Sequence, residues 1–94
     1  MPFVYIVQCK DGSLYTGIAK DVARRLAEHQ AGRASRYTRS RLPVLLAWSR
    51  RVPSWSHALR EEHRIKALPR TAKLVLAQAA PLAGRFRGAV RSVR

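Results

Sequence analysis

The sequence contains few sulfur-containing residues, few acidic residues and no long run of apolar residues. Its single cysteine, Cys9, cannot form a disulfide within the chain, and no Cys/His cluster has the spacing of a zinc site. No segment approaches the roughly 20 apolar residues of a membrane-spanning helix. The chain also lacks a Walker-type glycine loop, paired carboxylates for a metal and an internal repeat. These absences argue against a disulfide scaffold, a membrane protein and P-loop chemistry.

The scarcity of acidic residues leaves the protein strongly basic. Five Asp or Glu stand against 19 Lys or Arg, which gives a formal net charge of +14. Arg outnumbers Lys 15 to 4, and the guanidinium group binds phosphate through two parallel hydrogen bonds. Hydrophobic residues, at 47%, are sufficient for one folded domain in 94 residues. We therefore expect a nucleic-acid partner, DNA first with RNA as the alternative.

The N-terminal residues MPFVYIVQCK do not have the basic-then-apolar order of a signal peptide. We expect a cytoplasmic protein associated with the nucleoid, with no membrane and no small-molecule cofactor.

Two stretches near the N-terminus predict a β-hairpin. Residues 3–8, FVYIVQ, and residues 13–18, SLYTGI, are rich in β-branched and aromatic residues and flank a DG turn signal. With a two-residue loop, Tyr5 and Tyr15 fall on opposite faces, whereas a three-residue loop ending in Gly12 places them on one face. We predict the three-residue loop. The two tyrosines are then either a paired site or ordinary sheet aromatics.

A helix follows the hairpin, with Asp21 as its N-cap, an end near Gln30 and Gly32 as its stop signal. Helical spacing places Arg25 and His29 on the apolar stripe of this helix. Either residue alone has an ordinary explanation, because an arginine stem can cover apolar surface and a buried histidine can be a satisfied core residue. Together, after the tyrosine hairpin, they indicate a polar site.

The segment GRASRYTRSR, residues 32–41, interleaves four arginines with a tyrosine and predicts a basic loop that is too polar for a core element. Arg36, Tyr37 and Arg39 are candidates for phosphate contact and base stacking, and Lys20 is a further candidate. The alternative is a solvated arginine-rich loop.

Three more elements complete the predicted domain. These are a strand at residues 44–49, a regular helix at residues 55–68 and a short helix at residues 70–80. We assign the domain to residues 1–79. Residues 80–94 form a basic Gly/Arg-rich tail, which we expect to be disordered and to adhere to nucleic acid.

The regular helix carries the one acidic side chain that requires a partner. Helical spacing places Glu62 on its apolar stripe with Trp55 and Leu59, and Glu61 outside that stripe. A carboxylate that points inward requires a cation. Lys66, four residues on, supplies one as a weak ion pair. In the alternative, Glu62 holds a divalent ion against a phosphate that Lys66 also contacts.

These residues resemble the motifs of the GIY-YIG domain in its small stand-alone form. VYI at residues 4–6 stands at the position of the first motif, and YTG at residues 15–17 at that of the second. Arg25 stands where the family has its catalytic arginine, His29 where it has His or Tyr, and Glu62 at its metal-binding glutamate. Either short motif alone is weak, but the ordered set is specific and spans most of the chain.

The resemblance implies an α/β fold with a three-stranded antiparallel sheet flanked by helices. It also implies an endonuclease that hydrolyses DNA phosphodiester bonds with one Mg²⁺ or Mn²⁺ ion, in DNA processing or repair. Glu62 would hold the ion, Arg25 would neutralise the phosphate, and Gly17 would keep the backbone close to it. One of Tyr5 and Tyr15 would take a proton from water while the other orients it.

A tyrosine acts as a base only if nearby cations lower its pKa, which is about 10 when unperturbed. Arg25 and the metal are the candidates for that effect. His29 would support one of the tyrosines through a hydrogen bond.

Three positions differ from the family pattern. Val4 replaces the first glycine, Thr16 replaces an aliphatic residue, and Ile18 stands where some members have lysine. The chain also contains no asparagine. Two alternatives therefore stay open: a catalytically silent nucleic-acid-binding module on the same fold, and an RNA-associated interaction protein. With no recognisable second domain, we expect cleavage to be structure-selective or weakly sequence-specific.

Overall fold

The structure is a computed structural model that describes residues 1–79 of the 94-residue chain. The predicted tail, residues 80–94, lies outside the described residues. The elements in chain order are β1 (Phe3–Cys9), β2 (Leu14–Ala19), α1 (Val22–Gln30), α2 (Arg36–Arg39), β3 (Val44–Arg51), α3 (Trp55–Lys66) and α4 (Arg70–Ala79). No helix within residues 1–79 has the length and apolar character needed to cross a bilayer.

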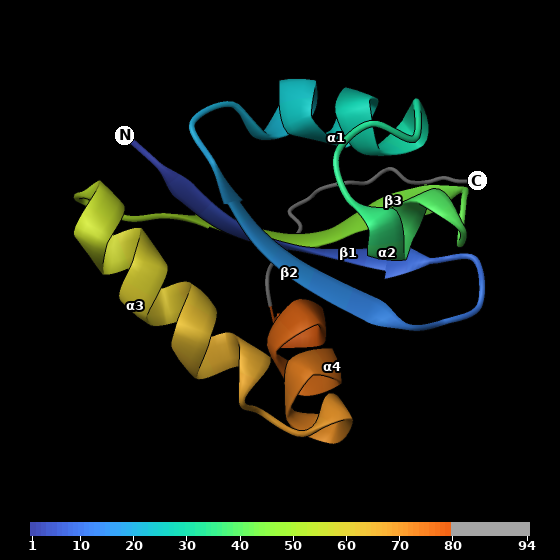
Figure 1. The fold of residues 1–94 in the computed structure, drawn as a ribbon. Helices are drawn as coiled ribbons and strands as arrows, with labels where there is room; N and C mark the ends of the chain where they lie inside the picture. Colours follow the sequence, from blue (N-terminus) through green and yellow to red (C-terminus); the bar gives the residue numbers. More distant parts are fainter. Residues whose placement is uncertain (80–94) are drawn as a thin grey trace.

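The three strands form one antiparallel sheet in the order β2-β1-β3. Figure 1 shows the sheet between α1 on one side and α3 and α4 on the other. The central strand β1 is paired along both edges and covered on both faces, which suits its β-branched and aromatic sequence. The predicted α/β class and the three-stranded antiparallel sheet are confirmed.

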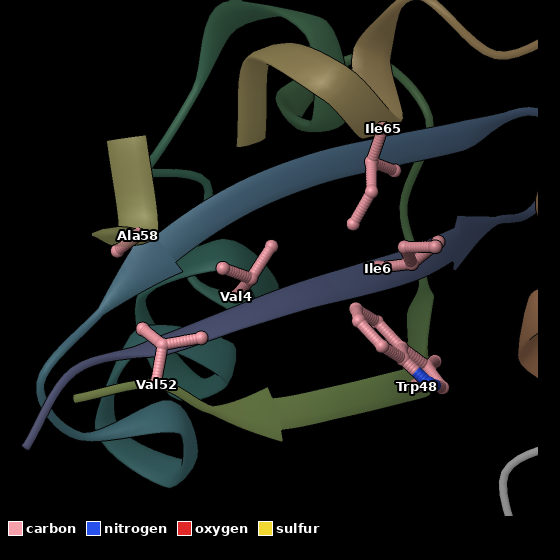
Figure 2. Packing of buried hydrophobic residues seen from close by; sticks show 6 residues of the cluster. All are labelled: Val4, Ile6, Trp48, Val52, Ala58 and Ile65. Carbon is pink, nitrogen blue, oxygen red and sulfur yellow. The ribbon is translucent and has the colours of Figure 1, made fainter. Parts of the chain in front are cut away.

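The hydrophobic core has two parts, one on each face of the sheet. The part beneath α3 and α4 (Figure 2) consists of Val4, Ile6, Trp48, Val52, Ala58 and Ile65. The part beneath α1 consists of Tyr5, Val7, Cys9, Ala19 and Val44. Burying an aliphatic side chain of this size contributes about 1.5–3 kcal/mol. Because β1 supplies both parts in alternation, its register decides which face each tyrosine occupies.

The hairpin adopts the predicted three-residue loop. Tyr5 pairs with Gly17 and Val7 pairs with Tyr15, so both tyrosines lie on the α1 face. Gly12 has a φ of 86° and donates a hydrogen bond of 2.9 Å from its N–H to the Cys9 carbonyl. A residue with a Cβ is strained in that left-handed conformation, so glycine suits this loop position.

Side-chain caps define where the helices begin. The Asp21 carboxylate accepts a hydrogen bond of 3.0 Å from the Arg24 N–H at the start of α1. Ser54 caps α3 in the same way through the His57 N–H, at 3.1 Å. Both caps satisfy backbone donors that have no partner within their helix.

The prediction that residues 32–41 are only a basic loop is wrong. This segment contains α2, which Ser35 caps by accepting a hydrogen bond from the Tyr37 N–H at 3.1 Å. Thr38, on α2, is fully buried. The arginines concealed a single helical turn because their charge dominates the composition, whereas the serine cap and one buried threonine decide the structure.

The predicted apolar stripe of α3 is also displaced. Ala58 and Ile65 are the buried residues of this helix, whereas Trp55 and Leu59 are 45% and 48% exposed. Two sheet-facing positions seven residues apart are enough to anchor α3, because they lie almost directly above one another. The larger apolar side chains therefore lie outside the core.

Thr16 provides a test of core packing. It lies on β2, opposite Ile6, and its hydroxyl is buried without a hydrogen-bond partner. Because an unsatisfied buried hydroxyl is destabilising, we expect Thr16→Val to raise the free energy of unfolding by about 1 kcal/mol. Urea unfolding measures the change. Thr38→Val is the control, since its hydroxyl is bonded and its loss should destabilise the protein. An unchanged or lower stability of Thr16→Val would contradict the prediction.

Candidate active site

Tyr5 lies on β1 with its ring across the neighbouring strand at Gly17. A Cβ at residue 17 would lie 2.6 Å from the Tyr5 hydroxyl oxygen and 2.7 Å from its Cζ. Any side chain at this position would therefore displace the ring. The structure gives Gly17 the function of accommodating Tyr5, and its approach to a phosphate stays a prediction.

The Tyr5 hydroxyl leads into a buried chain of hydrogen bonds. It lies 2.9 Å from Nε2 of His29, and Nδ1 of the same ring lies 2.8 Å from the Thr38 hydroxyl oxygen. Thr38 donates its own hydrogen to the Ser35 carbonyl at 3.4 Å. Its oxygen therefore accepts from Nδ1–H, which leaves Nε2 of the neutral ring as an acceptor. Tyr5 thus donates its hydroxyl proton to His29.

The pKa shifts agree with a neutral His29 ring and a protonated Tyr5 hydroxyl. Burial lowers the pKa of His29, and the Arg25 charge lowers it further while Glu28 opposes the shift. Burial also raises the pKa of Tyr5, and Arg25 opposes that shift only in part. Arg25 acts on the Tyr5 pKa in the expected direction, but burial outweighs it in the protein alone. Loss of phenolate hydration outweighs the attraction of one half-exposed guanidinium.

The His29 shift predicts how stability depends on pH. The folded state keeps His29 neutral, whereas the unfolded chain binds a proton below about pH 6.5, so the free energy of unfolding falls as pH drops below that value. We expect His29→Gln to flatten this decline in urea titrations at several pH values. His63→Gln, at an exposed position on α3, is the control and should leave the decline in place. A decline of equal steepness in His29→Gln would contradict the assignment.

Tyr15 joins the same cluster from β2. Its ring centroid lies 5.4 Å from that of His29, and that of Tyr5 lies 5.8 Å from it, both with edge-on geometry. Tyr15 also stacks on Tyr37 of α2, with centroids 6.0 Å apart. The Arg41 guanidinium carbon lies 4.0 Å from the Tyr37 ring centre. The structure therefore places Tyr37 beside the tyrosine pair.

Arg25 extends from α1 at the edge of this cluster. Its guanidinium lies 3.4 Å from the carboxylate of Glu28, which is also 3.7 Å from Arg24. Sequence reasoning missed Glu28, although its spacing of three and four residues from these arginines is the usual signal of helical ion pairs. A phosphate that approaches Arg25 competes with Glu28 for the guanidinium.

Glu62 lies on α3, which packs against the other face of the sheet, and acts on Tyr5 through its charge. Its carboxylate is among the charges that raise the pKa of Tyr5. Glu61 faces elsewhere: it binds Arg64 at 2.7 Å, and the Arg50 charge on β3 helps to lower its pKa. The two adjacent glutamates therefore interact with different groups.

The prediction that only Glu62 points inward is wrong. The side chains of Glu61 and Glu62 are 18% and 21% exposed, so both are largely covered. The reason is that the buried stripe centres on Ala58 and Ile65, and the two glutamates flank it at similar angles.

Known proteins with similar sequences identify the family of this chain. A model of the GIY-YIG catalytic domain matches residues 1–74. The chain belongs to the GIY-YIG family. It is 49% identical over 76 residues to a UPF0213 protein of Halobacterium salinarum, covering 81% of this chain and 99% of that protein. A UPF0213 protein of Staphylococcus saprophyticus is 46% identical over 74 residues, covering 79% and 90% of the two chains.

One solved structure supports the same family assignment. The solution NMR structure of a UPF0213 protein from Bacillus halodurans has a TM-score of 0.55 and 42% identity, and the match covers 85% of this chain and 86% of that one. The predicted family and fold are confirmed. GIY-YIG domains form a nuclease superfamily that generally uses a divalent metal, so nucleic acid is the implied class of substrate. The names of the UPF0213 relatives state no activity.

Two carboxylates act on Tyr5 through their charges: Glu28, which pairs with Arg25, and Glu62, the glutamate that the family motif assigns to the ion. Within residues 1–79, no three His, Cys, Asp or Glu side chains gather in a group that could hold an ion. A single carboxylate such as Glu62 is sufficient for a hydrated Mg²⁺ or Mn²⁺ ion. Mg²⁺ keeps several waters and binds through one or two carboxylates and substrate phosphates. The Lys66 ammonium lies 3.3 Å from Glu62 and occupies that carboxylate in the protein alone.

The remaining predicted nucleic-acid contacts lie farther out. Lys20, at the end of β2, is exposed and lines a cavity that Arg25 also lines. Arg36 and Arg39 are exposed on α2, and their side chains make no ion pair with the described residues. All three residues stay predictions of nucleic-acid contact.

Proposed function

We propose that this GIY-YIG protein is an endonuclease that hydrolyses phosphodiester bonds in DNA with one Mg²⁺ or Mn²⁺ ion. One observation carries the proposal: groups from two helices, α1 and α3, act on the Tyr5 hydroxyl. His29 of α1 is bonded to that hydroxyl, while the charges of Arg25 and Glu62 both act on it. An acceptor for a proton, a cation for a phosphate and a carboxylate for a metal are the parts that phosphodiester hydrolysis requires.

The proton of the attacking water passes through Tyr5. The Tyr5 oxygen takes that proton as its own moves to Nε2 of His29, which the neutral ring leaves free to accept it. This transfer does not require a free phenolate, so it is compatible with the raised pKa of Tyr5. Tyr15, whose ring contacts His29 from the next strand, orients the water.

Arg25 stabilises the negative charge that develops on the phosphate. Because Arg25 pairs with Glu28 in the protein alone, phosphate binding exchanges one anion for another at the same guanidinium. Glu62 would hold the ion, which would supply neutralisation of phosphate charge and a lower pKa for a water. The leaving oxygen takes its proton from solvent.

Contacts with the DNA backbone supply most of the affinity. The proposed contacts are five exposed residues, Lys20, Arg36, Tyr37, Arg39 and Lys66. Such contacts do not read sequence, so we propose structure-selective or weakly sequence-specific cleavage in DNA processing or repair. Each phosphate neutralised adds about 0.9 to the slope of log affinity against log salt on duplex DNA.

The test is cleavage of labelled single-stranded, duplex, nicked and branched DNA with Mg²⁺, Mn²⁺ or EDTA. We expect metal-dependent cutting that Tyr5→Phe and Arg25→Ala reduce about a hundredfold or more. Arg64→Ala is the control, because Arg64 pairs with Glu61 on α3 and belongs to none of the proposed contacts. Cutting that persists in EDTA, or an equal loss in the control, would overturn the proposal.

One observation favours a second candidate, a nucleic-acid-binding module without catalysis. The Lys66 ammonium already neutralises Glu62, which weakens that carboxylate as a metal ligand. Such a module would bind every DNA in the panel with and without metal and would cut none of them. A strong preference for RNA that is insensitive to Tyr5 and Tyr15 would instead favour the RNA-associated protein.

A further inference from the structure

A cavity shares Arg25 with the proposed hydrolysis, which assigns no function to the space itself. It has a volume of about 360 Å³ and lies between the end of β2, α1 and the start of α3. Its lining includes Lys20, Asp21, Arg24, Arg25, Glu28 and Trp55. We call it the Trp55 cavity. Ligand pockets in proteins span about 300–1,000 Å³, so its size suits one small planar ligand with a charged neighbour.

The indole of Trp55 is available to such a ligand. The other tryptophan, Trp48, is 7% exposed and packs in the core, whereas Trp55 is 45% exposed. The ring contacts among the described residues involve Tyr5, Tyr15, Tyr37 and His29, and none involves Trp55. A large apolar ring that is exposed at a cavity is a surface on which a nucleobase can stack.

The charged groups around the indole suit a phosphate beside that base. Lys20, Arg24 and Arg25 supply three cations, and two carboxylates oppose them. Asp21 is occupied as the cap of α1, and Glu28 is shared between the two arginines. A phosphate that displaces Glu28 therefore gains two guanidinium partners.

The cavity also lies at the right place relative to the proposed chemistry. Arg25 belongs both to the lining and to the groups that act on Tyr5. Trp55 and Glu62 are seven residues apart on α3, so they lie on one side of the helix and about 10 Å apart along its axis. That distance equals about three nucleotide steps of a DNA strand.

We propose that the Trp55 cavity binds one unpaired nucleobase within a few nucleotides of the scissile phosphate, stacked on the Trp55 indole. A base in a duplex has both faces covered by its neighbours, so it enters such a cavity only from a single strand or after leaving the stack. The cavity thereby selects single-stranded, flapped or branched DNA over continuous duplex. This inference rests on the proposed nuclease function for the position of the phosphate.

Trp55 fluorescence tests the proposal directly. In Trp48→Phe protein, Trp55 is the single tryptophan, and EDTA prevents metal-dependent cutting during the titration. We expect a short DNA single strand to quench the emission, and the same strand paired with its complement to quench it far less. A strand of equal length without bases should bind through its phosphates and leave the emission unchanged. Equal quenching by duplex and single strand would overturn the proposal.

Affinity measurements with the native Trp48 make the test independent of that substitution. We expect Trp55→Ala to weaken single-strand binding about tenfold, as loss of one base stack does, and to leave duplex binding unchanged. Leu59→Ala is the control, because Leu59 is equally exposed on the same helix and does not line the cavity. Equal effects of both variants, or no effect of Trp55→Ala, would overturn the proposal.

The failure of this inference is distinguishable from failure of the nuclease function. If single-stranded DNA quenches Trp55 emission but is never cut, the base site is supported and the proposed hydrolysis is contradicted. If DNA is cut but does not quench Trp55 emission, the base site is contradicted and the proposed hydrolysis is supported. A ribo-oligonucleotide that quenches as strongly as DNA supports a base site that accepts either sugar.

Discussion

Glu62→Gln is expected to reduce DNA cleavage by a factor of about a hundred to a thousand, the range seen when one stabilising group is lost from a transition state. The substitution keeps the shape of the side chain and removes the negative charge that attracts a divalent ion. DNA binding should persist, because the change leaves all cationic side chains in place and removes a negative charge that repels phosphate.

The matched control for this prediction is Glu61→Gln. The two glutamates are adjacent on α3 and similarly buried, but Glu61 binds Arg64 and lies near Arg50, away from the tyrosines. We expect near-normal cleavage by this variant and a small loss of stability from its ion pair. Initial rates on the preferred DNA form, at several Mg²⁺ concentrations, measure both variants. Equal rates for the two would show that no ion is held at Glu62.

The local part of the site was predictable from the sequence. The DG turn between two strands left two loop lengths open, and the predicted three-residue loop, which the structure confirms, places Tyr5 and Tyr15 on one face. Helical spacing then placed His29 on the buried face of α1, where it meets both rings. Periods of two and 3.6 residues are sufficient for such inferences because they act within one element or between adjacent strands.

The parts that depend on packing between distant elements were not predictable. Thr38 lies in an arginine-rich segment, and only its contact with His29 reveals its function. On α3, the larger side chains Trp55 and Leu59 suggested the wrong centre for the buried stripe. The raised pKa of Tyr5 likewise depends on how completely the fold covers its ring, which no sequence pattern reports.

Gly17→Ala is expected to have the second large effect. The added methyl would lie 2.6 Å from the Tyr5 hydroxyl oxygen, so the ring must move and its bond to His29 must lengthen or break. Because proton transfer by a positioned side chain contributes about a hundredfold to ten-thousandfold, we expect cleavage to fall by at least about a hundredfold. The backbone itself tolerates alanine, since Gly17 is not among the glycines with positive φ.

A double-mutant cycle with Tyr5→Phe separates the two possible functions of Gly17. If Gly17 acts only by accommodating Tyr5, Gly17→Ala should add little to the loss already caused by Tyr5→Phe, because both changes disable the same proton transfer. If the glycine instead lets the backbone approach the scissile phosphate, the two losses should multiply. Thermal unfolding of all three variants excludes loss of the fold as the cause. Additive free-energy changes would therefore return Gly17 to the phosphate contact that the family motif implies.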